Sequence, residues 1–90
     1  MDTSNSTART VRVLYFGGAK ESAGTSEEQL ELPDAVRTIG EFAVFLERER
    51  PALAGRLGAV RFAVNEEFAD ASVTLRPGDV IAVIPPVSGG

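Results

Sequence analysis

Hydrophobic and polar positions alternate in two stretches near the start of the chain. In "TVRVLYFG" (residues 10–17), every second residue from Val11 falls on one face, and the opposite face ends at Phe16. This period of two, in β-branched and aromatic residues, predicts a β-strand that ends at the two glycines after it. "EEQLELP" (residues 27–33) predicts a second, weaker strand. The intervening "AKESAGTS" (residues 19–26) is expected to be a loop.

The period changes to that of a helix over residues 38–50, "TIGEFAVFLERER". Its apolar residues recur at i, i+3, i+4 and i+7 and form one stripe: Ile39, Phe42, Ala43 and Leu46. Thr38 and Glu41 have the spacing of a capping box, in which each side chain bonds a backbone N–H of the first turn. Pro51 is expected to end this helix.

The last third of the chain returns to strand patterns. The expected elements are a strand in "AVRFAVN" (59–65), a polar turn around Phe68 in "EEFAD" (66–70), a short strand in "SVTL" (72–75), a turn in "RPGD" (76–79) and a final strand in "VIAVI" (80–84). The order of elements is β-β-α-β-(β)-β, which predicts an α+β fold whose one main helix covers one face of the sheet.

The final strand is apolar at both parities, as strands buried on both faces are. One interpretation is a central strand whose second face is partly covered by loops. The other is an apolar patch left for a partner protein. Val83 and Ile84, at the end of this strand, are candidate partner-binding residues, together with Phe16 on the face of its strand opposite Tyr15.

The length of 90 residues fits one domain. Residues 1–9 are polar and are expected to be a disordered lead-in, residues 10–84 the folded domain, and residues 85–90 an extended tail. The sequence has neither an apolar run of membrane-spanning length nor the apolar core of a signal peptide near its start. A cytoplasmic protein is therefore expected.

Composition removes several kinds of chemistry. The sequence has no cysteine and no histidine, which excludes disulfides and any Cys or His nucleophile or base. No metal site is expected, since the acidic group Glu66, Glu67 and Asp70 is typical of a solvated turn. The net charge is -4 and the basic residues are scattered, which argues against nucleic acid and anionic membranes as partners.

The six residues "PPVSGG" follow the final strand. Pro85 and Pro86 have no N–H, so they cannot continue a sheet and favour a stiff extended chain. Fully extended, the tail could reach roughly 20 Å from the sheet. Val87 and Ser88 continue the tail, and Ser88 is interpreted as a spacer rather than a nucleophile. The glycines at 89 and 90, which lack side chains, could enter a narrow channel. The terminal carboxylate of Gly90 is the candidate reactive group, although a flexible end without function would look similar.

The chain resembles the molybdopterin synthase small subunits, which are ubiquitin-like sulfur carriers. The resemblance spans about residues 11–90 and rests on "VRVLYFGGAKESAG", "FAVNEEFAD" and above all "LRPGDVIAVIPPVSGG". It implies a β-grasp fold, with a mixed sheet of four to five strands packed on one main helix. The family usually has Arg where this chain has Lys20, for which a partner contact and a solvated surface position are both open. Val83 and Ile84 replace the aromatic residues that the family often carries.

The resemblance also implies a role for Gly90. An E1-like activating enzyme would adenylate its carboxylate with ATP, and a sulfur donor protein would convert it to a thiocarboxylate. The loaded tail would insert into the large subunit of the synthase, in an expected heterotetramer, and pass sulfur to cyclic pyranopterin monophosphate. This chain would bind no cofactor itself, and it would be a sulfur-donating subunit whose partner supplies the catalytic groups.

Three alternatives stay open at this point. The chain could carry sulfur in another pathway, such as synthesis of the thiazole of thiamine. It could be a ubiquitin-like modifier that forms isopeptide bonds with lysines. It could also be a β-grasp interaction module with a tail that does nothing.

Overall fold

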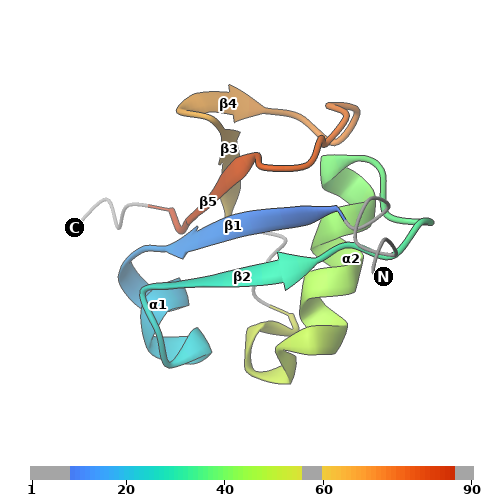
Figure 1. The fold of residues 1–90 in the computed structure, drawn as a ribbon. Helices are drawn as coiled ribbons and strands as arrows, with labels where there is room; N and C mark the ends of the chain where they lie inside the picture. The colour runs from blue at the N-terminus through green and yellow to red at the C-terminus, as the bar shows by residue number, and fades with distance from the viewer. Residues whose placement is uncertain (1–8, 56–59, 87–90) are drawn as a thin grey trace.

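A five-stranded mixed sheet and one main helix make up the fold, in a computed structural model that describes residues 9–55 and 60–86 (Figure 1). In chain order the elements are β1 (Thr10–Tyr15), α1 (Gly17–Ala23), β2 (Glu27–Glu31), α2 (Ile39–Glu49), the 3₁₀ turn η2 (Pro51–Leu53), β3 (Arg61–Val64), β4 (Glu67–Ala69) and β5 (Val80–Ile84). Within these ranges, the helices lack the length and apolar character needed to cross a membrane.

The first and last strands pair in the middle of the sheet, whose strand order is β2-β1-β5-β3-β4. β1 and β5 run parallel, in a register that extends from Arg12 opposite Val80 to Tyr15 opposite Val83. The other three strand pairs are antiparallel, with β2 and β4 at the two edges (Figure 1). The end of β5 therefore lies at the centre of the sheet.

The core lies between one face of this sheet and α2. The predicted alternation in β1 is confirmed, since Val11, Val13 and Tyr15 are all at most 2% exposed. Phe42 of α2 is fully buried and packs edge-on against Phe62 of β3, with ring centroids 6.0 Å apart. Burying a side chain of this size contributes about 1.5–3 kcal/mol. These contacts fix the helix across the sheet.

The capping box predicted for α2 is confirmed. The Thr38 hydroxyl accepts a hydrogen bond from the N–H of Glu41, and the Glu41 carboxylate accepts one from the N–H of Thr38. A backbone hydrogen bond from Arg37, joined by the bonds from Thr38, lowers the pKa of Glu41. These bonds satisfy N–H groups that the first turn of a helix leaves without intrahelical partners.

The loop expected over residues 19–26 is wrong, because residues 17–23 form the helix α1. Its first turn begins with backbone bonds from Ala19 and Lys20 to the carbonyl of Phe16. Only Ala19 of its seven residues is buried. A helix this short, with one buried residue, carries no apolar stripe from which the sequence could reveal it.

Two expectations in the last third are also wrong. "EEFAD" is not a turn around Phe68: residues 67–69 form the edge strand β4, and the turn is at Asn65 and Glu66, whose φ angles are +51° and +74°. Both positive angles are typical of a type I′ hairpin turn, here without the glycine that usually marks it. Residues 72–75 form no strand beyond a single bridge from Thr74 to Thr38, since their backbone bonds the segment that enters α2.

A half-buried polar network ties β1 and β2 to the end of α2. The Tyr15 hydroxyl donates a hydrogen bond of 2.5 Å to Glu28, and the Arg50 guanidinium forms an ion pair with the same carboxylate. Burial and the bond to Glu28 raise the pKa of Tyr15 well above its ordinary value. Burial also acts to raise the pKa of Glu28, but the hydrogen bonds from Arg50 and Tyr15 outweigh it and lower that pKa.

Replacing Glu28 with Gln should lower the free energy of unfolding by about 1–2 kcal/mol at neutral pH, because Arg50 loses its counter-charge. The folded-state pKa of Glu28 is lowered, so its contribution is complete above the ordinary pKa of 4.5 and is lost as the pH falls through the folded value. Urea denaturation of both proteins across the acid range would measure this. A difference in stability that persists unchanged at the lowest pH would contradict the role of the ionised carboxylate.

Candidate functional site

The chain leaves the sheet at its centre, where β5 passes into Pro85 and Pro86. Neither proline has an N–H to pair with, so the strand ends at Ile84. Pro85 is half-buried and Pro86 is exposed. The predicted tail residues Val87, Ser88, Gly89 and Gly90 lie outside the described residues, as does most of the predicted lead-in.

The face of the sheet opposite α2 is only partly buried. Four apolar side chains are half-exposed there: Leu14, Val80, Ala82 and Ile84. The helices α1 and α2 do not cover this face, and their buried residues belong to the core instead. A shallow hollow of about 560 Å³ lies on this face. We call its six large or central apolar lining residues the apolar face: Leu14, Phe16, Phe68, Val80, Ala82 and Ile84.

Strand pairing brings the apolar face together. Leu14 of β1 lies opposite Ala82 of β5, Ala82 lies opposite Ala63 of β3, and Ala63 lies opposite Phe68 of β4. This row crosses four strands on one side of the sheet. Ile84 lies two residues beyond Ala82, on the same side and directly before the prolines. The apolar face therefore borders Pro85 and Pro86, which we call the root of the tail.

The structure separates the residues that the sequence analysis groups as partner-binding. Phe16 is 48% exposed and, with Ile84, lines the apolar face. The assignment of Val83 to this group is wrong: Val83 is fully buried in the core, where it cannot reach a docked protein. Successive side chains of a strand point to opposite faces, so Val83 and Ile84 cannot share one surface.

Lys20 lies elsewhere. It is exposed on α1 and does not line the hollow over the apolar face. Its backbone carbonyl accepts the N–H of Gly24, which closes the end of the helix. A contact between Lys20 and a partner stays a prediction.

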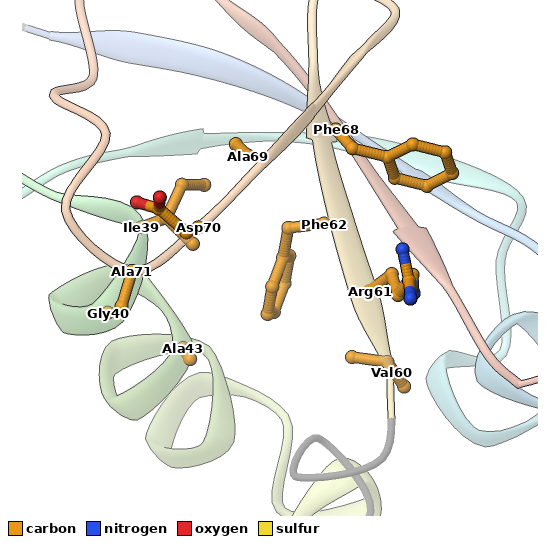
Figure 2. A pocket seen from close by; sticks show the side chains of 10 residues that line it. All are labelled: Ile39, Gly40, Ala43, Val60, Arg61, Phe62, Phe68, Ala69, Asp70 and Ala71. Carbon is orange, nitrogen blue, oxygen red and sulfur yellow. The ribbon is translucent and has the colours of Figure 1, made fainter.

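Phe68 is the residue that the sequence analysis misses. It is 67% exposed, and the guanidinium carbon of Arg61 lies 5.4 Å from the centre of its ring. Figure 2 shows Phe62 and Arg61 on opposite sides of the β3 ribbon, with Phe68 on the Arg61 side. Such a cation–π contact orients the ring without burying it. The available signal is the pairing that follows once Asn65 and Glu66 are taken as the turn, which puts Phe68 opposite Ala63 of β3.

Polar side chains hold the hairpin of β3 and β4 against the start of β5. The Asn65 amide donates to Asp79 at 3.0 Å, and its oxygen accepts the N–H of Val80 at 3.0 Å. Asp79 also accepts the N–H of Arg76 at 2.7 Å. Asp79 thus belongs to the turn, as its sequence context suggests. These bonds fix the position of β4, and with it Phe68, relative to β5.

A second hollow, of about 540 Å³, lies between the start of α2 and strands β3 and β4 (Figure 2). Ile39, Ala43 and Phe62 give it an apolar floor. Helix and chain approach closely beside it, since a Cβ on Gly40 would lie 3.2 Å from the Cβ of Ala71. The four candidate partner-binding residues, Phe16, Lys20, Val83 and Ile84, do not line this hollow. Within the described residues, no cluster of His, Cys, Asp and Glu is arranged to hold a metal ion.

Solved structures confirm the predicted β-grasp fold. SAMP1 from Haloferax volcanii, a small archaeal modifier protein, superposes with a TM-score of 0.79 at 27% identity, covering 90% of this chain and 99% of its own. The complex of subunits 1 and 2 of the molybdopterin-converting factor from Helicobacter pylori contains a chain with a TM-score of 0.62 at 32% identity, with coverage of 90% and 99%.

Sequence comparison agrees with the resemblance. The molybdopterin synthase sulfur carrier subunit of Homo sapiens is 37% identical over 83 residues, which cover 89% of this chain and 93% of the human protein. The ThiS family matches residues 13–90. Since both matches span nearly the whole chain, this protein belongs to the ThiS family.

Proposed function

We propose that this chain carries sulfur as the small subunit of a molybdopterin synthase, in the cytoplasm. The position of the tail root in the sheet is the main support for this proposal. β5 delivers Pro85 and Pro86 from the centre of the sheet, at the border of an exposed apolar face. The 37% identity to a molybdopterin synthase sulfur carrier subunit supports the same role.

The chemistry takes place at Gly90. Its carboxylate is a poor electrophile, so an E1-like enzyme first joins it to AMP from ATP and releases pyrophosphate. A sulfur donor protein then supplies sulfide-level sulfur, which forms the C–S bond and displaces AMP. The thiocarboxylate sulfur attacks a carbon of cyclic pyranopterin monophosphate, forming a C–S bond while a C–O bond at that carbon breaks and its oxygen leaves. Water later cleaves the acyl–sulfur bond, which leaves a thiol on the pterin and returns the Gly90 carboxylate. Since the sequence has no cysteine, no side-chain thiol competes as the carrier.

The apolar face is the docking surface for the large subunit in this proposal. Phe16, Phe68 and Ile84 present apolar area around the tail root, and the related chain from Helicobacter pylori was solved in a complex of subunits 1 and 2. Binding through this face would hold the sulfur beside the substrate, which turns a bimolecular reaction into a local one. Two carriers and two large subunits form the expected heterotetramer. Lys20, which is exposed on α1 outside the apolar face, is expected to add a further contact.

A second candidate function is protein modification. The structural match to SAMP1 favours it. Adenylation of Gly90 would begin both reactions, but a lysine amine would then displace AMP and form an isopeptide bond. A sulfur carrier of another pathway, such as thiamine thiazole synthesis, would share the loading steps. The identity of the accepting molecule separates these functions.

Deleting Gly90 should abolish sulfur transfer while the fold and docking persist, because the reactive carboxylate moves one residue back along the tail. The measurement is product formation by the reconstituted synthase, alongside thermal unfolding and affinity for the large subunit. Synthesis at the wild-type rate by the deleted chain would contradict the proposal.

Replacing Ile84 or Phe68 with Asp should weaken binding to the large subunit by about 2 kcal/mol, which is roughly thirtyfold in Kd, because a charge would be buried in the interface. Val44 provides the matched control: it is 56% exposed on α2, outside the apolar face, so Val44→Asp should leave Kd unchanged. Titration calorimetry measures all three variants. Equal affinities for Ile84→Asp and Val44→Asp would rule out docking through this face.

A further inference from the structure

The corner between β1 and α1 touches the root of the tail. The N–H of Phe16 donates a hydrogen bond of 3.2 Å to the carbonyl of Val83. Gly17 follows in a left-handed conformation, with φ of +52°. A Cβ on Gly17 would lie 3.0 Å from Cγ of Pro85 and 3.9 Å from its Cδ. The Pro85 ring therefore packs where a side chain at position 17 would be.

These two contacts restrain the exit of the chain from β5. The hydrogen bond fixes the carbonyl of Val83, two residues before Pro85. The close approach to Gly17 limits where the Pro85 ring can lie. Because that ring is covalently part of the backbone and sets φ near −65°, placing the ring also orients the main chain at Pro85. The corner thus constrains the direction of the main chain at Pro85.

We propose that Gly17 is a positioning residue for sulfur transfer. Because Gly17 has no side chain, the Pro85 ring can pack against it, and this contact, which we call the seat, orients the tail. This inference rests on the proposed function of the tail. It differs from docking through the apolar face: docking sets how tightly the carrier binds, whereas the seat sets whether the bound tail points into the reaction site. A carrier with a displaced seat should bind normally and react slowly.

Three glycines of the α1 region separate backbone strain from contact with Pro85. Gly17 has both a positive φ and the close approach to Pro85. Gly24, at the other end of α1, has a φ of +78°, but a Cβ there would meet nothing within 4 Å. Gly18 has neither feature. A side chain is strained at Gly17 and Gly24 alike, but only at Gly17 does it push on the tail root.

The experiment compares Gly17→Leu, Gly24→Leu and Gly18→Leu, each loaded as the thiocarboxylate. Affinity for the large subunit and the single-turnover rate of sulfur transfer are measured separately. Gly17→Leu should keep Kd within about threefold and slow transfer by roughly tenfold to a hundredfold, since a misplacement of about 1 Å can cost that much. Gly24→Leu should lose stability only. Gly17→Ala should slow transfer less than Gly17→Leu, although its backbone strain is the same.

Transfer by Gly17→Leu at the rate of Gly24→Leu would overturn the inference. So would a loss in the Gly17→Leu protein that higher concentrations of the large subunit fully restore, because that loss would belong to docking. If the wild-type chain transfers no sulfur, the proposed function fails, and NMR of the free chain still tests the seat. The seat requires a nuclear Overhauser effect between Gly17 Hα and the Pro85 ring, and an amide shift at Val87 in Gly17→Leu but not in Gly24→Leu. The absence of either result would exclude the seat.

Discussion

The parallel pairing of β1 with β5 is the constraint on which the rest of the structure depends. It places the last strand at the centre of the sheet, between β1 and β3. Because both strands run the same way, the end of β5 lies beside the end of β1, where Phe16 and Gly17 turn into α1. The tail root therefore meets the corner before α1. The proposed site thus combines the end of β1, the hairpin of β3 and β4, and the end of β5, which are distant in the sequence.

A single main helix gives the two faces of this sheet different roles. α2 buries the face that carries Val13, Val83 and Phe62, which supplies most of the core. The opposite face keeps its apolar side chains only half-covered. An isolated monomer gains nothing from that exposure, whereas a subunit that docks by this face buries it. One sheet thus holds the fold together on one side and offers a binding surface on the other.

Much of this could be predicted from the sequence, because strong periods report burial directly. β1, β5 and α2 with its capping box follow from alternation, from an apolar run and from helical spacing. The short elements could not be predicted in this way, because α1 buries only one residue and β4 is only three residues long. Phe68 was missed for that reason, and Val83 was misassigned because an apolar run at both parities does not say which parity faces the helix. The contact of Gly17 with Pro85 joins residues 68 positions apart, which no local pattern reveals.

Sulfur loading changes the intact mass of the chain, which can be measured after incubation with its activating enzyme, ATP and a sulfur donor. We expect a mass increase equal to one oxygen replaced by one sulfur, located by fragmentation on the C-terminal peptide that contains Gly90. An unchanged mass, with an activating enzyme shown to be active on another carrier, would contradict the claim that this protein carries sulfur.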